Sequence, residues 1–344
     1  MNSFFFMGCW SEDRCDTLDY RTAVIQHILR EKYAFGVIAG DNIYQQRGVY
    51  HMKTLDYGFQ MLRQTNVPLY TLLGNHDVHT KTIFQAHMKL VQQKHIIMPR
   101  HCYTVEYPNL RLIVIDTNVL TSKVNRGNTY ARLLNDYPAF FSLPTATELL
   151  DYLENELKKP FKGWTIVTGH EPFISVKLTK TDRVKVTHLK HYERLTELLS
   201  ASPRTVYLCA DVHTFQVMNV PVSNSKTKTN TATIPQVVVG TGGAFPDRSP
   251  DEHTAISVPV SHEDHRVPPL TFKLEGTSAP YGYISVSYSS KQLWIRFHPL
   301  KGCSEGQSEM TFEYKKDRLV LVHRVPVKKT QCPARPAGEK LCHL

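Results

Sequence analysis

Short, largely apolar segments alternate with amphipathic ones along the first 210 residues, and this alternation limits the possible folds more than any other feature. Six apolar runs are too short for buried helices and predict strands covered on both faces. They lie at residues 4–7, 35–39, 69–73, 111–115, 165–168 and 205–209. Helical spacing occurs between them, at residues 18–30, 55–62, 83–91 and 148–157. Strands that alternate with helices predict a layered α/β fold.

The second half of the chain is richer in strands, with further runs at residues 235–239, 283–288 and 293–297. We expect a single domain over residues 1–327, which is long enough to bury a large core. Two polar stretches, at about 222–233 and 247–269, are expected to be loop insertions, and residues 328–344 a tail outside the core. No run of about 18 apolar residues occurs, so no transmembrane segment is expected.

Metal-binding residue types follow four of the predicted strands. The segments are Gly-Asp-Asn-Ile-Tyr at 40–44, Gly-Asn-His-Asp at 74–77, Thr-Gly-His-Glu-Pro at 168–172 and Cys-Ala-Asp-Val-His at 209–213. In open α/β sheets, ligands bind outside the carboxyl ends of the strands, so these segments should share one rim. The side chains delivered there are oxygen and imidazole donors, which suit two hard or borderline cations. They are Asp41, Tyr44, Asn75, His76, His170, Asp211 and His213.

The order of these motifs resembles the calcineurin-like metallophosphoesterase superfamily. The spacing Gly-Asp-x-x-Tyr at 40–44 and Val-x-x-His at 167–170 is similar to that of the small purple acid phosphatases. This resemblance implies a four-layer α/β/β/α sandwich and a metal-dependent phosphoesterase. It also implies a cofactor of two metal ions, iron paired with zinc, manganese or a second iron.

Carried over residue by residue, the resemblance implies a role for each motif position. Asp41 would bridge both metals, with Tyr44 and His213 on the first. Asn75 and His170 would bind the second metal. His76 would contact the phosphate and protonate the leaving group, and His79 is either a second such group or an exposed loop histidine.

The reaction implied is direct attack of a metal-activated hydroxide on phosphorus, without a covalent enzyme intermediate. Two metals about 3.5–4 Å apart share one bridging carboxylate and clamp the phosphoryl oxygens. The cations lower the pKa of bound water toward neutrality, which makes hydroxide available as the nucleophile.

Two positions depart from the family pattern. Cys9 occupies the place of the first-metal aspartate, and Asp211 replaces a second-metal histidine. Asp211 can still ligate, because carboxylate is an ordinary donor for such metals. Cys9 is either a thiolate ligand or a small buried residue, in which case water or a loop carboxylate from Glu12, Asp13 or Asp16 would serve the metal.

A thiolate at Cys9 makes Fe(III) a less suitable metal, because thiolates are soft donors that tend to reduce it. Cys9, Asp41, Tyr44 and Asp211 would together carry one more negative charge than the family's ligand set. That charge weakens the cations as Lewis acids, so we expect a pH optimum shifted upward.

Three function classes remain open from the sequence. The first is an active phosphoesterase acting on a phosphorylated small molecule or phosphoprotein. The second is a catalytically weakened phosphate-binding protein on the same fold, suggested by Cys9 and Asp211. The third is a phosphodiesterase or nuclease, which the net charge of +10 would suit. The spacing that ends at Tyr44 argues against a nuclease, because it resembles the phosphatases.

The seven cysteines are widely spaced and form no Cys-x-x-Cys pair, which favours a reducing compartment. Cys332 and Cys342 could still pair with each other. Residues 1–7 lack a basic segment and a long apolar run, so they predict a strand rather than a secretory signal. We therefore expect a cytoplasmic or otherwise intracellular protein, whose oligomeric state the sequence does not reveal.

Overall fold

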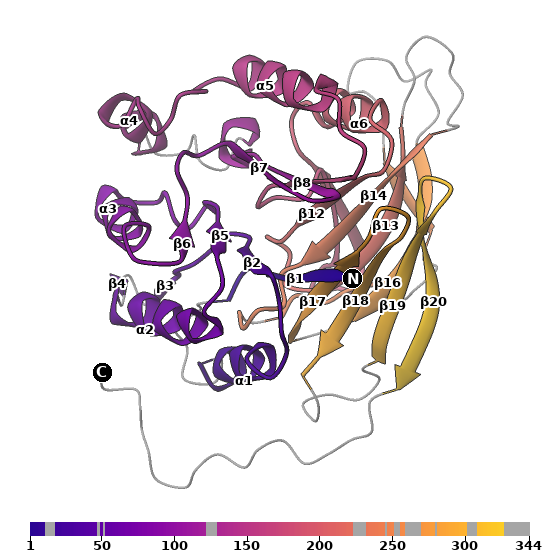
Figure 1. Ribbon diagram of the computed structural model, residues 1–344, viewed down its shortest axis with the longest axis horizontal. Helices are drawn as coiled ribbons and strands as arrows, with labels where there is room; N and C mark the ends of the chain where they lie inside the picture. The colour runs from indigo at the N-terminus through magenta and orange to yellow at the C-terminus, as the bar shows by residue number, and fades with distance from the viewer. Residues whose placement is uncertain are drawn as a thin grey trace, which may run out of the picture.

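Two eight-stranded sheets form the centre of the protein in the computed structural model (Figure 1). The structure describes residues 1–10, 18–46, 49–50, 52–121, 129–222, 232–244, 246–250, 255–258, 270–278, 281–300 and 308–326. Sheet A has the strand order β20 (Arg318–Pro326), β19 (Ser308–Lys315), β18 (Leu293–Pro299), β17 (Gly282–Tyr288), β1 (Asn2–Met7), β2 (Phe35–Ile38), β5 (Leu69–Thr71), β6 (Ile96–Ile97).

Sheet B faces sheet A and also has eight strands. Its order is β15 (Ala255–Val258), β16 (Leu270–Ser278), β13 (Phe215–Pro221), β14 (Thr233–Val239), β12 (Thr205–Cys209), β9 (Trp164–Thr168), β8 (Leu110–Val114), β7 (Tyr103–Tyr107). Two small hairpins pair β3 (Gln45–Gln46) with β4 (Val49–Tyr50), and β10 (Ile174–Leu178) with β11 (Val184–His188).

Helices cover the outer face of each sheet, which gives four layers. On sheet A lie α1 (Leu18–Ile28), α2 (Met52–Leu62) and α3 (Lys81–Leu90); on sheet B lie α5 (Ala146–Lys158) and α6 (Tyr192–Ser200). A further helix, α4 (Thr129–Asp136), and two 3-10 turns, Arg63–Thr65 and Thr117–Leu120, complete the helical elements described. The expected α/β/β/α sandwich is confirmed.

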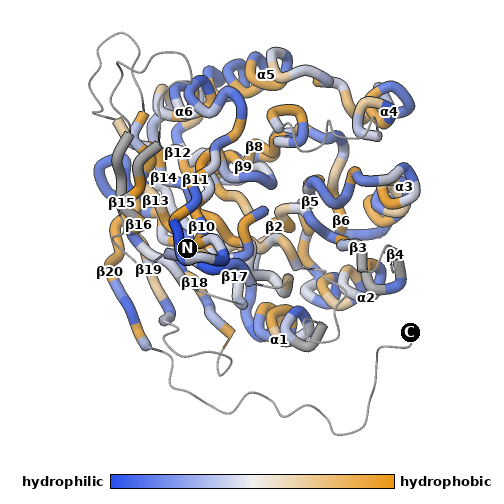
Figure 2. Tube along the Cα trace, turned by 180° about the vertical axis from the view of Figure 1, so that it is seen from behind, coloured by the Kyte–Doolittle hydropathy of each residue, from blue (hydrophilic) through white to orange (hydrophobic). Residues whose placement is uncertain are grey.

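The alternation of side chains along β1 shows how one strand serves two interfaces. Phe4 and Phe6 point into the cluster between the sheets, whereas Phe5 and Met7 pack against the helices of sheet A. Successive residues of a strand face opposite sides, so a strand covered on both faces must be apolar throughout. The peripheral helices instead mix hydrophobic and hydrophilic residues along their length (Figure 2).

Helix α5, for which the sequence predicted helical spacing at residues 148–157, begins at Ala146. Thr145 accepts a hydrogen bond from the Glu148 amide, and the Glu148 carboxylate accepts one from the Thr145 amide, which makes a complete capping box. None of the helices in the described parts of the chain is long and apolar enough to cross a membrane.

Several elements were not expected from the sequence. Strand β15 lies within residues 247–269, which we expected to be a loop; Ile256 is buried there and pairs with Phe272 of β16. The flanking proline, histidine and charged residues concealed this short apolar segment. Strands β10, β11, β19 and β20 were also missed, because charged residues interrupt or flank their short apolar runs. Residues 223–231, 259–269 and the predicted tail at 328–344 lie outside the described residues, so the domain boundaries remain predictions.

Candidate metal centre

The carboxyl ends of parallel strands from both sheets meet at one rim. In sheet A, β1, β2 and β5 are parallel neighbours, and in sheet B β9 and β12 are parallel neighbours. Direct hydrogen bonds join the two rims. The Gly8 amide donates to the Val239 carbonyl at 3.0 Å, and His170 Nδ1 donates to the Ala39 carbonyl at 2.7 Å. The motif loops from both sheets therefore form a single site.

Three of the candidate ligands sit on backbone that turns sharply at a strand end. Cys9, Asp41 and Asp211 have φ values of 52°, 50° and 59°, in the left-handed region. For a residue other than glycine this conformation costs about 1–2 kcal/mol. Such outliers persist where surrounding structure enforces them, and they cluster at functional sites.

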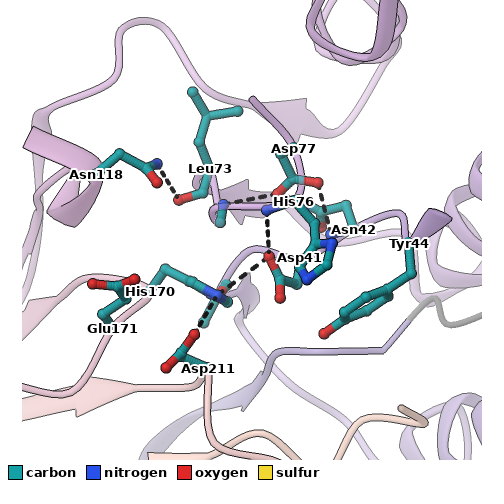
Figure 3. Close-up of polar contacts among 12 residues, drawn as sticks. Asp41, Asn42, Tyr44, Leu73, His76, Asp77, Asn118, His170, Glu171 and Asp211 are labelled. Atoms are coloured by element: carbon teal, nitrogen blue, oxygen red, sulfur yellow. Dashed lines mark hydrogen bonds and ion pairs between the residues drawn. The ribbon is translucent and has the colours of Figure 1, made fainter. Parts of the chain in front are cut away.

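Asp41 lies at the centre of the cluster (Figure 3). Its Oδ1 is 3.3 Å from His170 Nε2 and accepts a hydrogen bond from the His76 amide at 3.1 Å. Asp41 follows a strand of sheet A, whereas Asp211 follows β12 of sheet B. Asp211 Oδ1 lies 3.8 Å from the same His170 Nε2. Because Nδ1 of His170 donates to Ala39, Nε2 is the nitrogen directed at the carboxylates, a tautomer arrangement typical of metal-binding histidines.

A second group of donors lies on the other side of Asp41. One ligand atom each from Cys9, Asp41 and His213 lies within 4.8 Å of the other two. Tyr44 adds its hydroxyl 3.1 Å from His213 Nε2. Cys9, which the sequence left open, is thus placed among the candidate ligands of the first metal.

Several buried polar atoms at this rim have no hydrogen-bond partner among the described residues. They include Asn75 Oδ1 and His76 Nδ1. A buried polar atom without a partner costs free energy, so its retention calls for an explanation such as an ion. The oxygen, nitrogen and sulfur donors here are of the types that bind divalent transition metals, so the residues fit a metal centre.

The pKa values of the groups at this rim also reflect a surplus of acidic side chains. Burial and the charge of Asp41 raise the pKa values of the Cys9 thiol and the Tyr44 phenol well above their usual ranges. A bound cation reverses this effect, because it favours the thiolate and phenolate that coordinate it.

His170 lies close to two carboxylates, which favour its charged form. Burial lowers its pKa, but the carboxylates of Asp41 and Asp211 outweigh burial and raise the pKa of His170 to about 10. Burial raises the pKa of Asp41, and the two histidines beside it, His170 and His76, outweigh this and hold that pKa below its usual range.

Metal affinity should therefore increase with pH. Below pH 10 a cation must displace the His170 proton. Each proton displaced should make the apparent affinity for Zn²⁺ rise about tenfold for every pH unit between about pH 6 and 9. Competition with a chelator at several pH values measures this slope. Removal of one titrating group in His170→Gln should lower the slope, and an affinity independent of pH would contradict the expectation.

The side chain of Asp77 joins the two central loops by hydrogen bonds, a role that the sequence did not reveal. Its Oδ1 accepts from the Asn42 amide at 2.9 Å and lies 3.1 Å from His87 Nε2. Its Oδ2 accepts from the Gly74 amide at 2.8 Å and from Asn42 Nδ2 at 2.9 Å. Asp77 and His87 are fully buried, so this carboxylate holds the loops that carry Asp41 and Asn75 in fixed register.

Gly74 gives Asp41 the space that it needs. A Cβ at Gly74 would lie 2.2 Å from Asp41 Oδ1 and 2.3 Å from the Asp41 nitrogen. Gly74→Ala should therefore displace Asp41 and lower metal affinity at least about tenfold, with a stability loss of about 1–3 kcal/mol. Isothermal titration with Zn²⁺ and thermal unfolding measure the two effects.

A matched control for this substitution is available on β16. A Cβ at Gly276 would meet the Phe312 ring at 2.6 Å, away from the site. Gly276→Ala should lower stability and leave metal affinity unchanged. Equal metal affinity in Gly74→Ala and the wild type would show that Asp41 is not part of the metal site.

A second buried network supports the rim from sheet B. Asp116 Oδ2 accepts from the Tyr130 hydroxyl at 2.6 Å and lies 3.2 Å from His101 Nδ1. His101 Nε2 accepts a hydrogen bond from the Leu143 amide, so His101 Nδ1 carries the hydrogen and donates to Asp116. Asp116 Oδ1 also accepts from Asn118, whose amide donates to the Leu73 carbonyl just before Gly74 (Figure 3).

All the metal-ligand candidates predicted from the sequence lie at this rim. The His76 ring is tilted against the Tyr44 ring, with centroids 4.5 Å apart, and the His79 ring centroid lies 4.7 Å from that of His76 at the exposed side. Partial burial and the neighbouring His76 lower the pKa of His79. Glu12, Asp13 and Asp16, the carboxylates considered as substitutes for Cys9, lie outside the described residues.

The sequence matches the calcineurin-like phosphoesterase family over residues 3–215. Among solved structures, PhoD superposes with a TM-score of 0.63 at 13% identity, covering 96% of this chain and 73% of the PhoD chain. The purple acid phosphatase PPD1 from yellow lupin (Lupinus luteus) seeds gives 0.57 at 14% identity, covering 91% of this chain and 53% of that one. GAP50, the anchor in the inner membrane complex of Plasmodium, gives 0.52 at 17% identity, with coverages of 96% and 90%.

No curated protein sequence matches the chain. At these identities the structural likeness shows a shared fold, and it agrees with the four layers described above. The family match spans more than half of the 344 residues and includes every predicted ligand from Cys9 to His213. The chain therefore belongs to the calcineurin-like phosphoesterase family, as its motif order predicted.

Proposed function

We propose that this protein is a metal-dependent phosphoesterase that hydrolyses phosphate esters in the manner of the purple acid phosphatases. The observation that carries the proposal is the convergence of donors from both sheets on the carboxylate of Asp41. A phosphorylated small molecule or a phosphoprotein is the substrate class that such a centre suits. The family match supports the reaction class, while the substrate is set by the surrounding loops.

The donors divide into two groups that share Asp41. Cys9, Tyr44 and His213 would hold the first metal, and Asn75, His170 and Asp211 the second. The carboxylate of Asp41 would serve both groups, because it lies 3.3 Å from His170 Nε2 and has an oxygen within 4.8 Å of ligand atoms of Cys9 and His213. When bound, the metal pair supplies Lewis acidity toward the phosphoryl oxygens and toward water.

The chain's own groups would then orient the ester and handle its protons. His76 is half-buried beside Tyr44, its Nδ1 has no partner among the described residues, and its amide is fixed by Asp41. This placement suits proton donation to the leaving oxygen. His170 would be neutral once its proton is displaced, with its Nδ1 still held by Ala39.

Cys9 should favour zinc or Fe(II) over Fe(III), because it would bind as a thiolate. Loading with Co²⁺ should produce a sulfur-to-cobalt charge-transfer band in the near ultraviolet. Cys9→Asp should remove the band while Co²⁺ remains bound, and Cys209→Ala, at another buried cysteine, should retain it. A cobalt spectrum without a sulfur band would show that Cys9 is not a ligand.

Hydrolysis of an aryl phosphate tests the proposed function directly. The purified protein, loaded with Mn²⁺, Fe²⁺, Zn²⁺ or Co²⁺, should release phosphate, and a chelator should stop the reaction. The assay should run from mildly acidic to mildly alkaline pH, with more activity on the alkaline side because of the extra anionic ligand. Absence of turnover with all four metals across this range would refute the proposal.

A phosphate-binding protein without turnover is the second candidate, and the presence of Cys9 in place of an aspartate favours it. Its expected result is saturable phosphate binding by the metal-loaded protein without hydrolysis. Hydrolysis that Asp41→Asn abolishes would eliminate this candidate.

A further inference from the structure

Strand β20 presents an unusual concentration of exposed apolar side chains. Val320, Val322 and Val325 are 41%, 45% and 43% exposed, and they are three of the six exposed large hydrophobic residues in the described part of the chain. The strand is the last of sheet A, and Figure 1 shows it at the outside of the C-terminal hairpin. An exposed apolar edge strand is a template for pairing with another chain.

A side chain from sheet B occupies the beginning of this strand edge. Asn219 of β13 donates to the Leu319 carbonyl at 2.9 Å and accepts from the Leu319 amide at 2.8 Å. The side-chain amide of Asn219 thus forms the hydrogen bonds that a further strand would otherwise make with the backbone of Leu319. Leu319 is fully buried, whereas the residues after Leu321 are all exposed. Among the described residues, no strand pairs with this edge between Leu321 and the end of β20.

The pairing with β19 adds to the exposure of this segment. The register shifts between Thr311 and Phe312, so that Leu321 faces Phe312, His323 faces Thr311, and Val322 has no partner across β19. Val322 is accordingly among the most exposed apolar side chains. A bulge of this kind changes the direction of side chains at a sheet edge.

The charge of the strand limits what can pair with it. Residues 318–326 contain Arg318, His323 and Arg324 and no acidic residue. A second copy of this chain would bring a second basic strand and a second net charge of +10, which disfavours self-pairing. The chain's own continuation, residues 327–344, has four Lys or Arg and one Glu, so it does not complement the strand either.

We propose that β20 is a docking strand for an extended acidic segment of another protein. Main-chain hydrogen bonds would extend sheet A by one strand beyond Leu321. Apolar side chains of the partner would cover Val320, Val322 and Val325, and carboxylates on its other face would lie beside Arg324. Binding by strand addition takes affinity from the backbone and specificity from alternate side chains.

A nine-residue peptide of alternating Val and Glu, labelled with a fluorophore, is the probe. Fluorescence anisotropy with the full-length protein should show saturable binding, and hydrogen exchange should show protection of the amides from Leu321 to Val325. The triple variant Val320→Thr/Val322→Thr/Val325→Thr keeps β-branched side chains and should weaken binding about tenfold.

Two controls distinguish this proposal from nonspecific peptide binding and from self-association. Val184→Thr, at a valine of similar exposure on β11, should leave binding unchanged. Arg324→Glu should reverse the preference, so that a Val–Lys peptide binds better than the Val–Glu peptide. No saturable binding, equal binding of the two peptides by the wild type, or a dimer in which the β20 amides are protected would each overturn the proposal.

Discussion

Asp41→Asn is expected to abolish hydrolysis of an aryl phosphate, with a loss of at least about 10³-fold in kcat/KM. Asp41 is the one carboxylate that both donor groups share, since its Oδ1 is 3.3 Å from His170 Nε2 and it also lies near Cys9 and His213. Loss of several kcal/mol of charge stabilisation in the transition state corresponds to a factor of this size. Metal content should fall together with activity.

The variant should still fold, which makes the result interpretable. An asparagine oxygen can accept the His76 amide hydrogen bond that Asp41 accepts now. Asp151→Asn, at an exposed position on α5, is the matched control and should retain full activity and metal. Unchanged activity in Asp41→Asn would contradict the assignment of Asp41 as the shared ligand, whatever its metal content.

His76→Asn is expected to lower activity by about 10²–10⁴-fold toward an alkyl phosphate and much less toward p-nitrophenyl phosphate. The alkyl leaving group needs a proton as the P–O bond breaks, whereas p-nitrophenolate leaves readily without one. Metal content should stay constant, because His76 is placed at the leaving-group side and is not among the proposed ligands. Steady-state kinetics on both substrates, with metal analysis of each sample, make the measurement.

His79→Asn is the matched control for this prediction, since its ring lies 4.7 Å from that of His76 on the same loop. If His79 is an exposed loop residue, its replacement should change both rates little. A larger leaving-group effect in His79→Asn than in His76→Asn would transfer the proton-donor role to His79. Equal losses on both substrates in His76→Asn would indicate phosphate binding instead.

The sequence was sufficient to locate the rim because each motif directly follows a short apolar strand. A buried parallel strand must be apolar throughout, so its end is visible in the sequence, and parallel neighbours bring their ends together. Asp41, His170 and Asp211 could therefore be placed near one another before any distance was known. Their separations of 3.3 and 3.8 Å agree with that placement.

The supporting contacts could not be predicted in the same way. Asp77 lies within a motif, but its hydrogen bonds to Asn42 and His87 depend on how two loops pack, which no periodicity records. Similarly, Asp116 is joined to Tyr130 across 14 residues through a helix that the sequence did not predict. The left-handed backbone at Cys9 is also a tertiary effect, because cysteine has no local preference for it.

Two of the strands that the sequence missed, β19 and β20, lie at one end of sheet A. Strands β19 and β20 carry charged residues at alternate or adjacent positions, because one face or edge of each is exposed. Their apolar pattern is therefore incomplete, although Phe312 and Leu319 are fully buried. Edge strands are the least regular part of a sheet in sequence, and they are also where we expect a partner to bind.

Anomalous diffraction from crystals of the protein loaded with Zn²⁺ or Mn²⁺ would locate the bound metals. We expect two peaks per chain, about 3.5–4 Å apart, with the Asp41 carboxylate between them. Cys9, Tyr44 and His213 should surround one peak, and Asn75, His170 and Asp211 the other. A single peak that Asp41 does not touch, or metal bound away from this rim, would contradict this expectation.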